Sequence, residues 1–162
     1  MRAATALDAM DFRILAYLQR EGRATNVEVA DAVGLSPSPC LSRTKRLQAL
    51  GIIRGFGVHL ALAQLGDTIT IFVEVTVEKH RRQDLRRFEA AAATIREVME
   101  CYNVSGGYDY LLKVVTRDTG HYRSVMDALL QADVGIRKLR SFIVLREPFI
   151  RHDYPLDHLF DV

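Results

Sequence analysis

The stretch "VSGGYDYLLK", Val104 to Lys113, separates two segments that show the same succession of patterns. Before it, "TITIFVEVTV" (68–77) alternates like a strand, "RRQDLRRFEAAAATI" (81–95) has helical spacing, and "VMECYNV" (98–104) returns to strand character. From Tyr108 onward, "YDYLLKVVT" (108–116) is extended, "TGHYRSVMDALLQ" (119–131) carries a helical apolar stripe, and "IRKLRSFIVL" (136–145) is extended again. Two strand–helix–strand units therefore follow one another in tandem.

This order predicts a ferredoxin-like βαββαβ fold, in which a four-stranded antiparallel sheet carries both helices on one face. The quoted stretch is then the hairpin between the second and third strands. Gly106 and Gly107 supply the positive φ that a tight hairpin needs, and Asp109 can accept hydrogen bonds from nearby backbone. A turn alone requires neither Tyr108 nor Asp109, so the stretch is interpreted either as a turn or as a ligand site.

The N-terminal third predicts three short helices. Apolar residues keep helical spacing from Leu7 to Leu18, with Asp8 as N-cap, and Gly22 follows the end. Thr25 and Glu28 form a capping box that opens the second helix, and Gly34 ends it. The run "LSPSPCLSRTKRLQALG" (35–51) predicts a third helix with Ser38 as N-cap and Pro39 at the first helical position.

The third helix has one apolar and one cationic side. Helical phasing turns Cys40, Thr44, Leu47 and Gly51 toward one side. It turns Ser42, Lys45, Arg46 and Ala49 toward the other, with Arg43 on the flank. No acidic residue lies between Asp31 and Asp67. A short helix, a tight turn and a helix with a basic outer face are typical of a helix-turn-helix. The DNA-binding candidates are Ser36, Pro37, Ser38, Pro39, Ser42, Arg43, Lys45, Arg46 and Arg54. A bundle used only for dimerisation and a merely solvated basic face are the alternatives.

Other classes of site and location find little support in the sequence. No apolar run reaches the 18 to 20 residues, roughly, that a membrane span needs, so a cytoplasmic protein without membrane contact is expected. Cys40 and Cys101 form no CxxC pair, and we expect reduced thiols. No spacing indicates a catalytic acid/base pair, and no cofactor site is indicated. The tail holds possible metal ligands, which we interpret as an ordinary surface: His152, Asp153, Asp157 and His158.

Two motifs carry a family resemblance. Through "LDAMDFRILAYLQREGRATNVEVADAVGLSPSPCLSRTKRL" (7–47) and "VSGGYDYLLKV" (104–114), the chain resembles the Lrp/AsnC (leucine-responsive/asparagine regulator, or feast/famine) family of prokaryotic transcription factors. The resemblance implies an α+β fold. Its expected parts are an N-terminal winged helix-turn-helix (1–57), a linker strand (58–67), a ferredoxin-like, RAM/ACT-like effector-binding and oligomerisation domain (68–150), and a C-terminal tail (151–162).

The resemblance also implies a function. The chain is expected to be a sequence-specific regulator that binds double-stranded DNA, forms homodimers that assemble to tetramers or octamers, and responds to a small effector, usually an amino acid. The effector-binding positions implied are Asn103, Gly106, Gly107, Tyr108, Asp109, Tyr110, Thr119 and Phe142. Two positions depart from many relatives. Gly107 stands where an acid is common, and Ser42 stands where several relatives have glutamate.

Two other functions are compatible with this fold. Siroheme decarboxylases are similar in fold and have lost DNA binding, but the serine- and arginine-bearing third helix argues against an enzyme. The other alternative is an assembly protein, either an effector-independent architectural DNA-binding protein or a sensor or assembly module whose helix-turn-helix is vestigial.

Overall fold

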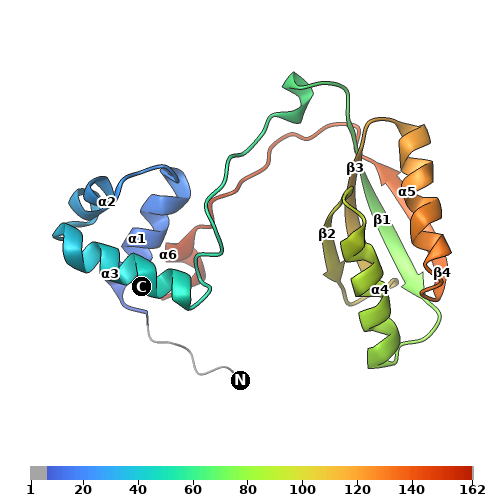
Figure 1. Cartoon of the computed structure of the whole chain (residues 1–162), viewed down its shortest axis with the longest axis horizontal. Coiled ribbons are helices and arrows are strands. Elements are labelled where there is room, and N and C mark those ends of the chain that lie inside the picture. The colour runs from blue at the N-terminus through green and yellow to red at the C-terminus, as the bar shows by residue number, and fades with distance from the viewer. Residues whose placement is uncertain (1–6, 162) are drawn as a thin grey trace. The chain divides into compact units, whose positions relative to one another are not determined.

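The computed structural model describes residues 7–161, which divide into two compact units (Figure 1). The first unit comprises the chain up to residue 59 together with residues from 149 onward, and the second comprises residues 60–148. The tail expected as a separate part therefore packs with the N-terminal helices. Within 7–161, no helix is both long and apolar enough to cross a membrane.

The first unit is helical. It contains α1 (Ala9–Arg20), α2 (Asn26–Val33), α3 (Pro37–Ala49) and the four-residue α6 (Leu156–Leu159) in the tail. Cys40 and Leu47 of α3 are buried, as the helical phasing predicted. They join a core completed by residues from α1 and α2, namely Ile14, Val29, Ala30 and Val33.

The predicted caps of the first two helices are confirmed. Asp8 is the N-cap of α1, and Thr25 forms the predicted capping box with Glu28. Gly34 ends α2 with a φ of 76°, a conformation that favours glycine. The predicted start of α3 is wrong, because Ser36 is the N-cap and Pro37 the first helical residue. Neither proline needs a backbone N–H in the first turn, so the helix begins one proline earlier.

The predicted linker strand is also wrong. Residues 58–67 contain a 3-10 helix (Leu62–Gln64) and no strand. No strand is assigned to the first unit within the described residues, so the wing implied by the resemblance is an extended segment without a paired partner. A β-ladder needs a hydrogen-bonding neighbour, and the alternating side chains of Phe56, Val58 and Leu60 stay exposed.

The second unit has the predicted ferredoxin-like order. Its elements are β1 (Ile69–Val77), α4 (Arg82–Thr94), β2 (Val98–Asn103), β3 (Tyr110–Thr116), α5 (Thr119–Gln131) and β4 (Ile136–Ile143). The strands form one sheet in the order β2-β3-β1-β4, and all the neighbouring pairs are antiparallel. The stretch after Asn103 is therefore the β2–β3 hairpin, as predicted.

One face of this sheet forms the core of the second unit. Alternate residues of β1, from Ile71 to Val77, are buried against Phe88 of α4 and Leu129 of α5. Because these strand residues share one face, both helices cover the same side of the sheet. The hairpin end of β3 lies beside Val75 of β1, which pairs with Tyr110. The fold thus places the candidate effector loop at the end of a central strand.

Candidate nucleic-acid interface and effector hairpin

The start of α3 is tied to the start of α2. Asn26 Nδ2 donates a hydrogen bond to the carbonyl oxygen of Pro37 at 2.8 Å. Ser36 makes no side-chain capping bond, and Ser38, Ser42 and Lys45 are exposed further along the helix. These side chains are small hydroxyls and a cation, the groups that reach phosphates and base edges when a helix lies in a DNA groove.

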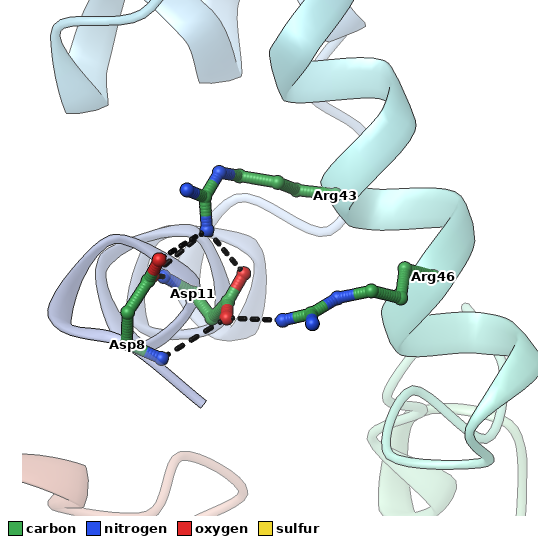
Figure 2. Close-up of polar contacts among 4 residues, drawn as sticks. All are labelled: Asp8, Asp11, Arg43 and Arg46. Atoms are coloured by element: carbon green, nitrogen blue, oxygen red, sulfur yellow. Dashed lines mark hydrogen bonds and ion pairs between the residues drawn. The ribbon is translucent and has the colours of Figure 1, made fainter. Parts of the chain in front are cut away.

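Arg43 and Arg46 turn their guanidinium groups toward the start of α1 (Figure 2). Arg43 Nη1 donates to Asp8 Oδ2 at 2.7 Å and to Asp11 Oδ1 at 2.9 Å. Arg46 Nη2 donates to Asp11 Oδ2 at 2.6 Å. We call these four residues the α1–α3 ion cluster. Together with Pro39 and Ser42, its members Asp8, Arg43 and Arg46 line an open hollow of about 370 Å³.

The cluster is organised around a buried carboxylate. The Asp11 side chain is fully buried, whereas those of Arg43 and Arg46 are 32% and 45% exposed. The backbone N–H of Asp8 also donates to Asp11 Oδ2, at 3.1 Å. Burying an unpaired carboxylate costs several kcal/mol, roughly, so the arginines first serve to neutralise Asp11.

Sequence reasoning missed the role of Asp11, although a signal was available. Asp11 follows Leu7 by four residues and precedes Ile14 by three, so it lies on the apolar stripe of α1. An acid in that position needs a cationic partner from another element.

The α1–α3 ion cluster offsets the charges of Arg43 and Arg46, so the net positive charge of this surface comes from other cations. The backbone N–H of Asp11, followed by the Arg43 guanidinium, lowers the pKa of the Asp8 carboxyl, while Asp8 and Asp11 raise the pKa of Arg43. The lowered pKa of Asp8 and the raised pKa of Arg43 both favour the charged forms of this pair, and the cluster sets two carboxylates against two guanidinium groups. Among the described residues, Lys45 and Arg54 have no ion-pair partner. They carry the uncompensated charge of this surface.

The β2–β3 hairpin is closed by backbone and side-chain bonds to one carbonyl. Val104 N and Asn103 Nδ2 both donate to the Asp109 carbonyl oxygen, each at 3.0 Å. Gly106 has a φ of 141° and confirms the predicted need for glycine, but Gly107 does not have a positive φ. The prediction that both glycines supply positive φ is therefore right only for Gly106.

Asp109 anchors this hairpin to the end of β1. Its Oδ2 accepts a hydrogen bond from Val77 N at 2.8 Å, and its Oδ1 lies 2.7 Å from His80 Nε2. The Asp109 side chain is 18% exposed. The backbone bond that the sequence suggested exists, but it joins residues that are distant in sequence. His80 was not among the predicted site residues, because nothing local to "KHRRQ" (79–83) indicates this partner.

The remaining predicted effector residues fall into separate places within one chain. Tyr110 is only 1% exposed; it packs on Phe88, and its hydroxyl donates to Glu89 Oε1 at 2.9 Å. Burial and the Glu89 carboxylate raise the pKa of this tyrosine. With Asn103, it lines a hollow of about 340 Å³ between α4 and β2.

Thr119 and Phe142 lie away from the hairpin. Thr119 is the first residue of α5, beyond the Thr116 end of β3, and six strand steps of roughly 3.4 Å place that end about 20 Å from Tyr110. Phe142 of β4 pairs with Phe72 of β1 and is 43% exposed. A single chain therefore does not bring all the predicted effector residues into one pocket.

The possible metal ligands of the tail are used otherwise. The His152 ring stacks on that of His59 with centroids 3.7 Å apart, and His158 Nε2 lies 3.7 Å from Asp157 Oδ2. Within 7–161, no group of three or more His, Cys, Asp or Glu residues could hold a metal ion. Cys40 is buried and Cys101 is exposed, and both are free thiols.

Each of the two units matches a known protein-domain family. Residues 7–54 match the model for a winged helix-turn-helix DNA-binding domain, and residues 70–153 match the model for the Lrp/AsnC ligand binding domain. The chain belongs to the Lrp/AsnC family. It is accordingly a DNA-binding transcriptional regulator whose second unit is a ligand-binding domain.

Individual members of the Lrp/AsnC family align over nearly the whole chain. The leucine-responsive regulatory protein of Haemophilus influenzae is 38% identical over 142 residues, which are 88% of this chain and 86% of the relative. The Escherichia coli K12 protein of the same name is also 38% identical, over 87% of this chain and 86% of its own length.

Solved structures of similar regulators share the fold of this chain over nearly its whole length. A Neisseria meningitidis transcriptional regulator in complex with L-methionine has a TM-score of 0.84 and 34% identity, covering 96% of this chain and all of the other, 100%. An AsnC family regulator from Agrobacterium tumefaciens has a TM-score of 0.84 and 30% identity, over 95% of this chain and 100% of its own.

Proposed function

We propose that this regulator contacts DNA through the exposed face of α3 and that an α-amino acid sets its assembly or its DNA affinity. The observation that carries the DNA part is the exposure of Ser38, Ser42 and Lys45 on one helix, beside an ion cluster that fixes that helix on α1. Ser36, Pro37, Pro39 and Arg54 flank this face. Arg43 and Arg46 hold the helix in place through Asp8 and Asp11, and in this proposal their remaining N–H groups contact the phosphate backbone.

Lys45→Ala provides the direct test of this interface. Because the lysine has no ion-pair partner within 7–161 and its side chain is exposed, its loss removes a phosphate contact without disturbing the fold. The slope of log affinity against log salt is expected to fall by about one for a duplex from the region upstream of its own gene. Arg123→Ala, an exposed cation on α5, is the matched control. A Lys45→Ala slope equal to that of the control would contradict the assignment.

The effector proposal is centred on the hairpin. Asp109 is the carboxylate suited to an α-ammonium group, and the backbone of Gly106, Gly107 and Tyr108 lies beside it. One relative was solved with L-methionine and others are named leucine-responsive, which supports an amino acid as the class of ligand. Gly107 supplies no second acid, so Asp109 carries the recognition of the ammonium group alone.

The effector site is proposed to be completed by a second copy of the chain. Thr119 and the exposed Phe142 lie far from the hairpin within one chain, which supports contributions from different protomers. We therefore propose a homodimer that assembles further to a tetramer or octamer. The proposed role is regulatory and non-enzymatic and requires no cofactor, and no observation favours a siroheme-decarboxylase activity.

A thermal-shift screen of the twenty amino acids tests the class of effector. A ligand that binds only the folded state stabilises it by about 2.7 kcal/mol at one hundred times its dissociation constant. We expect one amino acid, or a few of similar side chain, to raise the melting temperature. If none did so at millimolar concentration, the amino-acid proposal would be wrong, while DNA binding through α3 would stand.

A further inference from the structure

A dense run of cations on the second unit begins just before α4 and continues through the first half of that helix. Six cationic or ionisable side chains follow within nine residues, with Asp84 as the sole acid among them: Lys79, His80, Arg81, Arg82, Arg86 and Arg87. All of these are exposed. Arg82, Arg86 and Arg87 also line an open hollow of about 440 Å³ along the helix. We call the face formed by Lys79, Arg81, Arg82, Arg86 and Arg87 the α4 basic face.

Most of the charge of the α4 basic face has no ion-pair partner, although Lys79 and Arg87 share a hollow of about 200 Å³ with the acids Glu78, Asp84 and Asp133. In the part of the chain that the structure describes, Arg81, Arg82 and Arg86 have no side-chain hydrogen bond or ion pair. Arg87 donates one bond, at 3.4 Å, to the carbonyl oxygen of Asp133, and the buried Oδ2 of Asp84 has no hydrogen-bond partner. This face therefore differs from α3, where acids offset Arg43 and Arg46.

The arrangement is unfavourable for the helix itself. Arg82 and Arg86 stand four residues apart on one face, and like charges at this spacing destabilise a helix. The cations also lie at the N-terminal end of α4, where the helix dipole is already positive. The first turn of α4 holds one acid, Asp84, which is outnumbered by the cations around it. The face is suited to a polyanion whose binding offsets this repulsion.

We propose that the α4 basic face is a second DNA-binding surface, which contacts the phosphate backbone without reading sequence. Guanidinium groups bind phosphate oxygens in a bidentate way, and four of the cations are arginines. DNA is the polyanion that a regulator of this family binds. The surface adds a set of phosphate contacts to those of α3 and lies on the unit that carries the ligand-binding domain.

The test is charge removal in the full-length protein. The double variant Arg82→Gln/Arg86→Gln keeps long polar side chains on the helix but removes two charges. On a duplex of about 150 bp, the slope of log affinity against log salt is expected to fall by about 1.8, since each lost phosphate contact lowers it by about 0.9. Arg96→Gln/Arg123→Gln removes the same charge from exposed positions outside the face and is expected to leave that slope nearly unchanged.

Two results would overturn the proposal. One is a slope for Arg82→Gln/Arg86→Gln that equals the slope of the control variant. The other is a smaller mass for this variant than for the wild type in light scattering without DNA, because the face would then be an interface between copies of the chain. Lys45→Ala probes α3 separately, so failure of this inference is distinguishable from failure of the α3 assignment.

Discussion

Replacing Arg43 and Arg46 together by alanine is expected to destabilise the helical DNA-binding unit by about 3 to 5 kcal/mol. The reason is Asp11, whose side chain is fully buried and pairs with both guanidinium groups at 2.9 and 2.6 Å. Without them, the carboxylate keeps only the backbone N–H of Asp8 as a partner. The cost is the desolvation of a charge left in the core, rather than the worth of two surface ion pairs.

Hydrogen exchange of the full chain measures this effect separately for each unit. Amides of α1 and α3 are expected to exchange faster in Arg43→Ala/Arg46→Ala, while those of β1 and β3 keep their wild-type protection, because the ion cluster lies within the first unit. Lys45→Ala, on the same helix, is the matched control and leaves all rates unchanged. Unaltered protection of α1 in the double variant would show that the cluster does not hold the two helices together.

A third substitution shows whether the buried charge is the cause. Adding Asp11→Asn to the double variant removes the unpaired carboxylate and is expected to restore most of the lost protection. If the triple variant remained as unstable as the double one, packing of the arginine side chains would be the dominant contribution instead.

The fold was predictable because its information is periodic. The alternation from Ile69 to Val77 and the helical stripe from Leu85 to Ile95 are each local, and hydrophobic period distinguishes strand from helix. The alternation of a strand also predicts the burial of Tyr110, because Tyr110 stands two residues before Leu112 and therefore lies on the same inward face of the sheet. The predicted linker strand failed because strand formation depends on a neighbouring strand, which local pattern does not supply.

The candidate site was less predictable because its bonds join distant residues. Arg43 and Arg46 were correctly placed on α3, but their partners Asp8 and Asp11 lie 32 to 35 residues earlier. Asp109 likewise binds Val77 and His80, which are 32 and 29 residues away. Residue type and spacing identify a charged group, whereas the fold decides whether its charge faces a ligand or is neutralised internally.

Asp109→Ala is expected to reduce the thermal shift produced by the effector amino acid. A hydrogen bond to a charged group is worth about 1.5 to 3 kcal/mol, so loss of the only carboxylate in residues 104–109 should weaken binding by about 10- to 100-fold. The same change leaves Val77 N without its 2.8 Å acceptor and loosens the hairpin. The measurement is the midpoint of a titration of the full chain with the amino acid found active on the wild type.

Asp109→Asn separates charge from hairpin structure. The asparagine keeps an oxygen that accepts from Val77 N but carries no charge for an ammonium group. Weakened binding in both variants would support recognition by the carboxylate, whereas weakening in Asp109→Ala alone would assign Asp109 to hairpin structure.

His80→Ala is the opposite case, because it frees Oδ1 of Asp109, now 2.7 Å from the imidazole, while Val77 N still holds Oδ2. If Asp109 binds the effector, His80→Ala should bind it at least as tightly as the wild type, and a large loss of affinity there would contradict this account of the hairpin.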